Sequence, residues 1–313
     1  MENIVEIKDL NKTYGGKYKA LDNLSLSVKK GEIFGLLGPN GSGKSTTINC
    51  LLSLLNYDSG SIKIFGKEMT PESYDIKSKI GVVFQDVAVF AELTVYENIN
   101  YFCGLYIFDK AQRKQYVEDA IKLVGLGEFK KFYPKQLSGG LLRRLNIACG
   151  VAHKPELIIL DEPTVAVDPQ SRNNILDGIK KLNENGATII YTTHYMEEVE
   201  QICKKIVIID SGHVIASGTK EELKNLISTG EKITITIENL TQELVDKVSK
   251  LNNVISATNE NETLYVIYKK GEDNLSNLVD FLKSNNVKYS KIFSELPSLN
   301  DVFLELTGKG LRD

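Results

Sequence analysis

The chain has 313 residues, of which 42% are hydrophobic and 25% charged, and its formal net charge is −3. Such a length predicts one large domain and a smaller one, and the acidic balance argues against nucleic acid as the main partner, because phosphate backbones bind to basic surfaces. No apolar run approaches the roughly 20 residues of a membrane span, so any work at a membrane requires another polypeptide to supply the spans.

Cysteine and histidine usage indicates a reducing compartment. The four cysteines are scattered, three of them in helical patterns, which favours buried free thiols over disulfides or a metal site. The three histidines show no ligand spacing either. The N-terminal segment 1–8 is strand-like and carries mixed charges, which is not the pattern of a signal peptide. We therefore expect a cytoplasmic protein.

In the first 230 residues, strands alternate with helices. Residues 3–35 alternate apolar and polar side chains, which predicts an antiparallel β subdomain. Helical spacing dominates a predicted helical insertion at about 86–154. Strands alternating with helices predict a mostly parallel sheet covered on both faces. Further strands are expected at 33–37, 61–65, 80–84, 157–160, 187–192 and 205–209, and further helices at 170–183 and 195–203.

After Gly230 the pattern changes to short strands and helices in the order βαββαβ. This order is the split-βαβ arrangement, and it predicts a separate α+β accessory domain over 231–313 without a catalytic constellation. The expected strands are 233–237, 254–257, 263–268 and 287–293, and the expected helices are 242–251, 275–282 and 299–306.

A glycine-rich loop joins the predicted strand 33–37 to the helix after it. Glycines let successive backbone N–H groups curl around phosphate oxygens, and the positive end of the helix dipole adds to the attraction. Lys44 can reach the β- and γ-phosphates, and the Ser45 hydroxyl can ligate Mg²⁺. A turn without a ligand is the alternative, but the strand before the loop and the helix after it favour a G-x-x-x-x-G-K-[ST] phosphate loop. The predicted nucleotide-binding residues are Gly38, Pro39, Asn40, Gly41, Ser42, Gly43, Lys44, Ser45 and Thr46.

Two carboxylates, Asp161 and Glu162, end the apolar run 157–160. Ligands of α/β sheets bind at the C-terminal ends of strands, which is where these acids fall. Successive strand residues point to opposite faces, so the two acids can serve different tasks. Asp161 suits the outer shell of Mg²⁺, and Glu162 suits polarising the attacking water. A solvated pair at a strand end is the alternative, which the preceding phosphate loop disfavours.

A second glycine-rich turn, Leu137-Ser138-Gly139-Gly140, opens another helix. Ser138 is an ordinary helix N-cap, and a cap followed by two glycines also leaves backbone N–H groups bare enough to hold a γ-phosphate. One chain thus carries two phosphate sites, which cannot serve the same nucleotide unless the chain meets a second copy or a relative. Asp168-Pro169 has a similar double meaning, as the N-cap and first residue of a helix or as a functional acid.

Together, the phosphate loop, Leu-Ser-Gly-Gly, Asp-Glu-Pro-Thr and a strand-end histidine resemble the nucleotide-binding subunit of an ABC transporter over about residues 1–230. The resemblance implies an ABC-type P-loop ATPase fold, with ATP and Mg²⁺ as ligands. It implies that Tyr14 stacks on adenine and that Gln85 touches Mg²⁺ and the attacking water. It also implies that Asp168 crosses a dimer interface and that His194 holds the γ-phosphate, whereas a lone strand-end histidine is more often a surface residue.

Two departures from the family pattern are visible. Leu141 follows Leu-Ser-Gly-Gly where the family usually has glutamine or another polar or flexible residue, and Val165-Ala166-Val167 replaces the commoner small-Gly-Leu before Asp168. Neither departure removes a phosphate donor or a ligand of Mg²⁺ or water, so hydrolysis is still expected. The two departures bear on the rate of ATP hydrolysis and on the details of the expected dimer interface.

The segments 297–308 and 311–313 are similar to the ending of the ATPases of ABC-2-type drug-resistance exporters. This resemblance implies export of a drug, antibiotic or lipid-like compound through a separately encoded permease, which would place the chain on the inner face of the cell membrane. The permease is expected to dock on the helical insertion near Gln85. The apolar residues expected there, which are alternatively core, are Val87, Val89, Phe90 and Tyr96.

The expected assembly is a head-to-tail homodimer with each ATP between Gly38–Ser45 of one copy and Ser138–Gly140 of the other. Two other transporter-family functions stay open: the ATPase subunit of an importer, and a non-transport ABC ATPase acting on DNA or ribosomes. The latter is disfavoured because the chain has a single cassette, lacks coiled-coil heptads and is acidic. A third alternative makes 231–313 a regulatory binding module.

Overall fold

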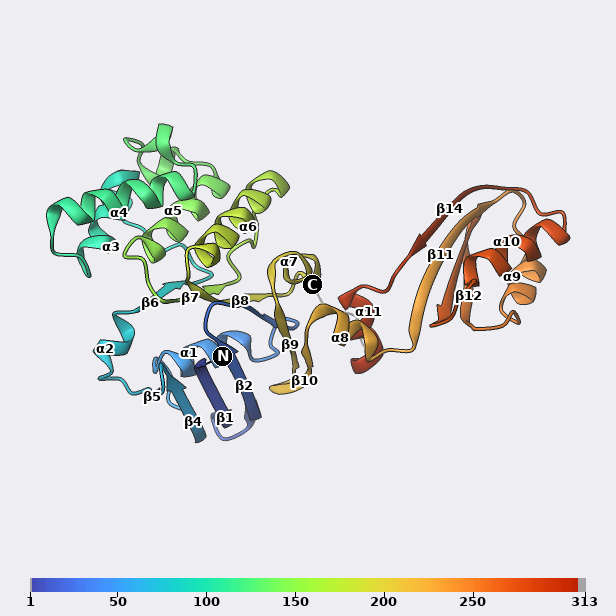
Figure 1. Cartoon of the computed structure of the whole chain (residues 1–313), viewed down its shortest axis with the longest axis horizontal. Coiled ribbons are helices and arrows are strands. Elements are labelled where there is room, and N and C mark those ends of the chain that lie inside the picture. The colour runs from blue at the N-terminus through green and yellow to red at the C-terminus, as the bar shows by residue number, and fades with distance from the viewer. Residues whose placement is uncertain (1, 309–313) are drawn as a thin grey trace. The chain divides into compact units, whose positions relative to one another are not determined.

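The computed structural model describes residues 2–308, so the tripeptide 311–313 lies outside the described residues. The chain divides into two compact units, the first ending at Thr219 and the second beginning at Lys220 (Figure 1). This division precedes the boundary expected from the sequence by eleven residues. The reason is that helix α8 (Lys220–Asn225) packs against α11 (Leu299–Thr307) of the second unit.

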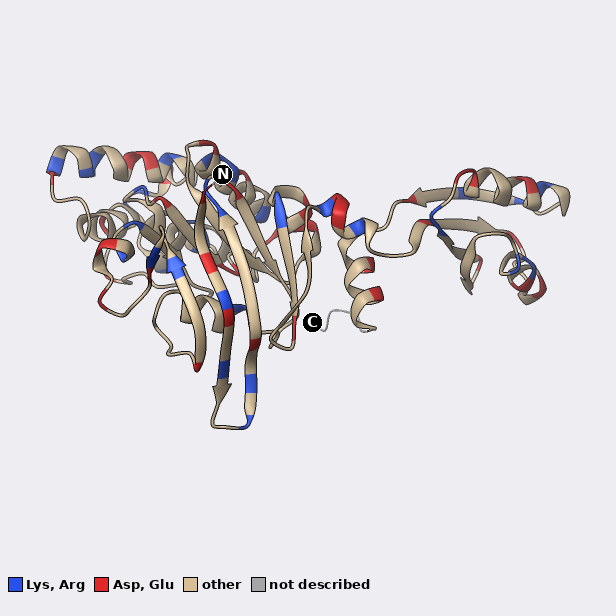
Figure 2. Ribbon diagram, turned by 60° about the horizontal axis from the view of Figure 1, so that its bottom comes forward, with Lys and Arg blue, Asp and Glu red and all other residues tan. Residues whose placement is uncertain are grey.

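An antiparallel sheet in the order β2-β1-β4-β5 begins the first unit, as predicted. Figure 2 shows acidic and basic residues interspersed along its two long strands. Their apolar side chains, such as Ile7 and Leu24, pack in one buried core with Ile48 of α1 (Lys44–Leu51). The strands are β1 (Asn3–Tyr14), β2 (Tyr18–Lys29), β4 (Ser59–Ile64) and β5 (Lys67–Glu68).

The central sheet of the first unit has the order β10-β9-β3-β8-β7-β6. All neighbouring strands are parallel except β10 and β9, which form an antiparallel hairpin. The middle strands are completely buried and mostly apolar, which is typical of a sheet covered on both faces. The carboxyl ends of β3, β7 and β8 therefore meet at one edge. The strands are β3 (Ile33–Leu37), β6 (Ile80–Val83), β7 (Leu157–Asp161), β8 (Thr188–Thr193), β9 (Lys205–Asp210) and β10 (His213–Gly218).

Helices α3, α4, α5 and α6 of the first unit each begin at a side chain that caps a free N–H group. Thr94 and Glu97 form a capping box at α3, and Asp109, Ser138 and Asp168 cap α4, α5 and α6. Helices α3, α4 and α5 form the predicted helical insertion (Figure 1). The bounds are α2 (Tyr74–Lys77), α3 (Val95–Gly104), α4 (Lys110–Leu123), α5 (Gly139–Val151), α6 (Pro169–Glu184) and α7 (Met196–Ile202), with 3-10 turns at Gly127–Phe129 and Pro134–Gln136.

The second unit is the predicted α+β domain. Its sheet has the order β12-β13-β11-β14 with every neighbouring pair antiparallel, so β13 lies between β11 and β12 as the split-βαβ arrangement requires. Alternate residues of β11, such as Ile233 and Ile235, share a core with Leu278 and Leu282 of α10. The bounds are β11 (Thr229–Ile237), α9 (Gln242–Val248), β12 (Val254–Glu260), β13 (Thr263–Lys269), α10 (Asn274–Ser284) and β14 (Tyr289–Glu295).

Helices long and apolar enough to cross a membrane are absent from residues 2–308. The four cysteines, all within that range, are buried free thiols.

Candidate active site

The glycine-rich loop lies between β3 and α1, where the sequence predicted it. Gly41 and Gly43 have φ angles of 79° and 107°, in the left-handed region that favours glycine. Gly38 is required for a different reason, since a Cβ there would lie 2.3 Å from the carbonyl oxygen of Ile209. The loop can therefore bring its backbone N–H groups close to an anion at the N-terminus of α1.

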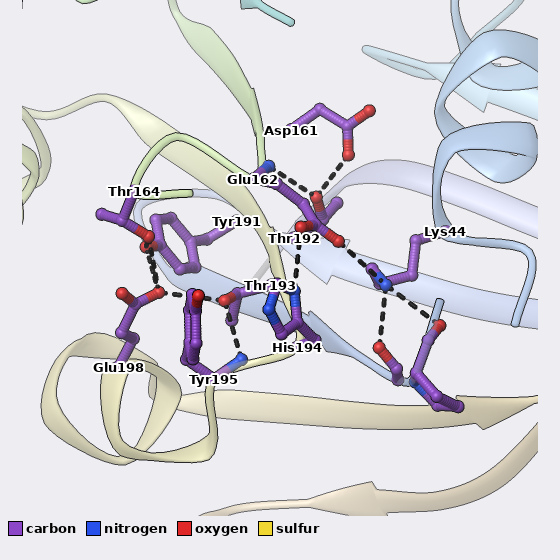
Figure 3. Close-up of polar contacts among 12 residues, drawn as sticks. Lys44, Asp161, Glu162, Thr164, Tyr191, Thr192, Thr193, His194, Tyr195 and Glu198 are labelled. Atoms are coloured by element: carbon purple, nitrogen blue, oxygen red, sulfur yellow. Dashed lines mark hydrogen bonds and ion pairs between the residues drawn. The ribbon is translucent and has the colours of Figure 1, made fainter. Parts of the chain in front are cut away.

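Lys44 connects this loop to the acid pair. Its ammonium donates to the carbonyl oxygens of Gly38 (2.8 Å) and Pro39 (3.2 Å) and lies 3.0 Å from Oε1 of Glu162 (Figure 3). Both charged side chains are almost completely buried. A buried charge is tolerated only where it is paired and hydrogen-bonded, and here the pair holds the cation at the phosphate loop.

The side chains of the two acids have different partners, but not through strand alternation as the sequence suggested, because only Asp161 lies on β7. Oδ1 of Asp161 accepts a hydrogen bond of 2.5 Å from the Thr192 hydroxyl. Glu162 follows the strand with a φ of 48°, a conformation that side chains other than glycine rarely adopt. Its N–H donates to both the carbonyl and the hydroxyl oxygen of Thr192, at 3.1 Å each, which holds this strained residue in place.

His194 lies directly after β8 and reaches the same carboxylate. Its Nδ1 is 2.9 Å from Oε2 of Glu162, so Glu162 lies between Lys44 on one oxygen and His194 on the other (Figure 3). The histidine ring is 17% exposed, whereas Glu162 is 6% exposed. The imidazole thus borders the solvent side of the carboxylate, where a ligand on the phosphate loop would arrive.

A cavity of about 300 Å³ lies over the phosphate loop. It brings together Lys44, Glu162 and Gln85 with most of the loop, in agreement with the sequence. Tyr18, which the sequence reasoning did not select, also lines the cavity, and its hydroxyl donates to the carbonyl oxygen of Gly41 at 3.2 Å. Tyr14 pairs with Tyr18 across the β1–β2 hairpin and is 41% exposed. The adenine-stacking role of Tyr14 therefore stays a prediction.

Gln85 is exposed, but its backbone is anchored by the helix that follows Leu-Ser-Gly-Gly. Nη1 of Arg143, a buried residue of α5, donates to the carbonyl oxygens of Gln85 (2.6 Å) and Phe84 (3.3 Å). Asn146, one turn further along α5, accepts from the N–H of Ala88 at 3.0 Å. The loop around Gln85 is thus tied to α5, a connection that the sequence pattern did not reveal.

The second glycine-rich turn lies at the N-terminus of α5 and packs against the N-terminus of α6. The Ser138 hydroxyl accepts from the N–H of Leu141 at 3.3 Å. A Cβ at Gly140 would lie 2.3 Å from Oγ of Ser171 and 3.1 Å from Oδ2 of Asp168, whereas a Cβ at Gly139 would meet nothing within 4 Å in the described chain. Gly140 is therefore required by packing within the chain, and Gly139 is not.

Asp168 is a helix cap in this structure. Its carboxylate accepts from the N–H of Ser171 at 2.9 Å, and this backbone hydrogen bond, together with that from the Ser171 side chain, lowers the pKa of Asp168. The described residues that line the 300 Å³ cavity include neither Asp168 nor 138–140. The structure of one chain thus leaves the second glycine-rich turn away from its own phosphate loop.

Of the two departures from the family pattern, at Leu141 and at 165–167, the second strains the backbone. Ala166 has a φ of 58°, in the left-handed region that costs an alanine roughly 1–2 kcal/mol, whereas the family pattern has glycine there. The side chain is exposed, so the strain comes from the backbone alone. Leu141 is half-buried, and its N–H is the one that Ser138 caps.

The fold and the site define the class of protein: a P-loop ATPase of the ATP-binding-cassette type. Residues 21–165 match the family described as ABC transporter, and residues 218–307 match the family described as the C-terminal domain of DrrA1-3-like ATP-binding proteins. The chain belongs to the ATP-binding proteins of ABC transporters, in the drug-resistance exporter group. The predicted family, fold and ATP-hydrolysing activity are confirmed.

Two known relatives are similar to this chain over nearly its whole length, and one solved structure is similar over about two thirds of it. The linearmycin resistance ATP-binding protein LnrL of Bacillus subtilis (strain 168) is 39% identical over 99% of this chain and 100% of its own length. The daunorubicin resistance ATP-binding protein DrrA3 of Streptomyces coeruleorubidus is 32% identical over 98% of this chain and 97% of its own. The cassette MJ0796, solved as a dimer bound to ADP and Pi, is 30% identical, covers 69% of this chain and 98% of its own, and gives a TM-score of 0.63.

Proposed function

We propose that two copies of this chain hydrolyse ATP at sites shared between them and thereby drive export of a hydrophobic drug or antibiotic through a separately encoded permease. The observation that carries the proposal is the separation of two phosphate-binding features within one chain. The phosphate loop, Lys44, Glu162 and His194 are joined by short contacts, while the open turn at Ser138 and Gly139 lies outside their cavity.

A head-to-tail pair makes one complete site from these two halves. Gly139 leaves room for a close approach and lies in the first turn of α5, where backbone N–H groups lack helical partners. Such groups bind anions, so the turn of one copy would hold the γ-phosphate bound to the loop of the other. A two-fold axis makes both sites equivalent. Hydrolysis removes the bridging phosphate, and the pair reopens.

The residues around Glu162 suit in-line attack of water on the γ-phosphate. Phosphate oxygens compete with Oε1 of Glu162 for the Lys44 ammonium, and this exchange leaves the carboxylate available to orient water and accept its proton. His194 borders the same carboxylate and supplies a donor toward the γ-phosphate. Asp168 crosses to the second copy, and Tyr14 stacks on the adenine, as the family resemblance implies.

The oxygen atoms of Ser45, Gln85 and Asp161 fit a Mg²⁺ ion in their chemistry. Mg²⁺ prefers oxygen ligands and usually keeps water and phosphate oxygens, so few protein ligands suffice. Ser45 and Gln85 line the cavity with exposed side chains, and Asp161 ends β7 beside it. The ion would neutralise charge on the phosphates.

The permease docks on the loop around Gln85. Phe84, Val87 and Phe90 are each about 40% exposed there, and the Phe90 ring stacks with Phe102 and meets Tyr101 edge-on. Val89 and Tyr96, which were also expected at the contact, are half-buried. Because Arg143 and Asn146 tie this loop to α5, movement of the permease reaches the turn at Ser138. The chain would then work on the cytoplasmic face of the membrane.

Replacing Glu162 tests the hydrolytic half of this proposal. Glu162→Gln keeps the side-chain shape but cannot accept a proton, so turnover should fall by roughly 10²–10⁴-fold while ATP binding persists. Analytical ultracentrifugation with ATP and Mg²⁺ should then show an accumulated dimer. Cells that express this variant with the permease should stop exporting the drug.

Lys44→Ala is the matched control for binding, because it removes the ammonium that reaches the phosphates. Its ATP affinity should fall, and no dimer should accumulate. Wild-type turnover in Glu162→Gln would refute the role of Glu162, and unchanged ATP affinity in Lys44→Ala would refute the phosphate-loop assignment.

A further inference from the structure

A buried carboxylate, Glu198 of α7, lies behind the site and is not explained by the proposed hydrolysis. It is 2% exposed. Its Oε2 accepts three hydroxyl hydrogen bonds, from Thr164 (2.9 Å), Tyr191 (2.7 Å) and Thr193 (2.9 Å), as Figure 3 shows. Its Oε1 lies 3.3 Å from Nε of Arg172 on α6. Three hydroxyl donors, two from β8 and one from the segment after β7, and one guanidinium from α6 thus converge on this side chain.

Two of these donors belong to the loops that carry the proposed catalytic groups. Thr164 lies two residues after Glu162, and Thr193 directly precedes His194. The Thr193 hydroxyl also accepts from the N–H of Tyr195 at 2.9 Å, so it holds the backbone on the far side of His194 as well. The Glu198 carboxylate therefore joins both loops through a single atom, Oε2.

Arg172 extends the cluster toward the ring of His194. Its guanidinium lies over the Tyr195 ring at 4.6 Å, and the Tyr195 ring contacts the His194 ring with centroids 4.1 Å apart. Arg172 is in the first turns of α6, the helix whose cap is Asp168. The segments 162–168 and 193–195 are thus braced from the same side.

We propose that Glu198 is a positioning residue for ATP hydrolysis, which sets the Glu162 and His194 loops in register by accepting hydrogen bonds from Thr164 and Thr193. This inference rests on the proposed roles of Glu162 and His194. Glu198 touches neither nucleotide nor water; it acts through the two threonines.

The chemistry of the buried cluster around Glu198 supports a role in aligning the segments that carry Glu162 and His194. Burying a carboxylate is costly unless donors surround it, and apolar side chains would fill the same volume without that cost. Burial, and then the charge of Glu198, raise the pKa of Tyr191 well above its ordinary range, so its hydroxyl stays protonated and can donate. Oε2 of Glu198 accepts all three hydroxyl hydrogen bonds, whereas Oε1 has, within residues 2–308, only the ion-pair contact with Arg172 and no hydrogen bond. Buried hydrogen bonds that converge on one atom hold their donors in one arrangement, and the productive geometry of a site tolerates little displacement.

Glu198→Gln tests the proposal because it keeps the size of the side chain while removing its charge and placing an amide beside Arg172. We expect kcat for ATP to fall roughly 10- to 100-fold, with KM and the affinity for a fluorescent ATP analogue changed by less than about twofold. Glu197→Gln, at the exposed neighbouring position of the same helix, should keep wild-type kcat. Val199→Ala, a fully buried position of that helix, is the control for lost stability, assayed below both Tm values.

A second pair of variants serves if Glu198→Gln does not fold. Thr193→Val removes one hydroxyl donor and should lower kcat at unchanged KM. Thr193→Ser keeps the hydroxyl and should retain the wild-type kcat. Wild-type kcat in Glu198→Gln or in Thr193→Val would overturn the proposal. So would a loss of kcat in Val199→Ala equal to that in Glu198→Gln at the same drop in Tm. Glu162→Gln, run in parallel, distinguishes failure of the proposed function from failure of the role of Glu198. If Glu162→Gln hydrolyses ATP normally, the proposed function is wrong. If Glu162→Gln is inactive while Glu198→Gln and Thr193→Val keep wild-type kcat, only the role of Glu198 is wrong.

Discussion

Glu162 combines a strained backbone with two side-chain partners, the Lys44 ammonium and the His194 ring, at a single position. Its positive φ costs roughly 1–3 kcal/mol, and both acceptors that hold the strained N–H belong to Thr192 of the neighbouring strand. The side chain is then directed between Lys44 and His194. A residue held in this way loses little freedom when substrate binds, which is what an electrostatically prepared site requires.

His153 allows a prediction about pH at the same scale. It is buried at the end of α5 and stacks on the Tyr106 ring at 3.9 Å, and burial lowers its pKa from 6.5 to about 4. Between these values the unfolded chain binds a proton that the folded chain does not, so stability should fall as the pH drops from 7 toward 4. The contribution of His153 between pH 7 and pH 5 is about 2 kcal/mol.

His153→Phe keeps the ring stack and removes the titration. Urea unfolding at pH 7 and pH 5 should show that the loss of stability between the two is smaller by about 2 kcal/mol in this variant than in the parent. Tyr106→Phe, which keeps both the stack and the histidine, is the control and should leave that difference unchanged. An equal acid sensitivity in His153→Phe and the parent would contradict the prediction.

At the level of elements, the N-termini of α5 and α6 pack closely, with the Ser171 side chain of α6 against Gly140 of α5. Gly140 permits this approach, because a Cβ there would overlap Ser171. Ser138 and Asp168 cap the two helices from the same region. Gly139 is the open position at the N-terminus of α5, where the first-turn N–H groups other than the capped N–H of Leu141 lack helical partners.

The two adjacent glycines should therefore respond differently to alanine. Gly140→Ala forces a shift of α5 against α6 and should cost about 1–3 kcal/mol of unfolding free energy. Gly139→Ala has room in the single chain and should leave its stability unchanged or raise it by up to about 1 kcal/mol. The same methyl group would lie where the partner's γ-phosphate binds, so Gly139→Ala combined with Glu162→Gln should not dimerise with ATP. Denaturation without nucleotide and ultracentrifugation with ATP measure these effects, and a normal ATP-dependent dimer would rule out the shared site.

At the level of the whole molecule, the first unit carries every residue of the proposed site, and the second unit has its own core. Residues 220–230, between the observed and the predicted boundary, belong to the second unit because they form hydrogen bonds with it. Glu305 of α11 accepts from Ser228 and Thr229, and the Lys270 ammonium donates to the carbonyl oxygen of Asn225. Leu223 and Ile227 in this segment are buried.

Truncation should reveal this boundary. A chain that ends at Thr219 should remain monomeric without nucleotide and bind ATP as the full chain does. A chain that ends at Gly230 keeps Leu223 and Ile227 without α11 and should aggregate, because it exposes apolar surface. Light scattering and ATP titration compare the two. Equal solubility would place the functional boundary at 230, and loss of regulation or assembly with intact ATP binding would identify the second unit as a regulatory module.

The motifs that carry the chemistry were predictable because they are local. A phosphate loop, an acid pair after an apolar strand and a serine cap each depend on a few consecutive residues and on the strand or helix beside them. The central strands and the split-βαβ order were also predictable from local sequence, because apolar residues recur clearly at strand or helix spacing within each element. The β10 strand was missed because His213–Gly218 is an antiparallel hairpin partner at the sheet edge, with a mixed pattern.

By itself, the sequence determined the family, most of the order of the elements and the motifs whose residues we propose to meet phosphate, because short-range chemistry and periodicity encode them. The tertiary structure decided which distant groups share a partner: Lys44 and His194 on Glu162, Arg143 on the loop of Gln85, and Thr164 and Thr193 on Glu198. All of these contacts except that between Thr193 and Glu198 join residues that are far apart in the chain. They arise only when parallel strands bring their carboxyl ends to one edge, and no local pattern records that juxtaposition.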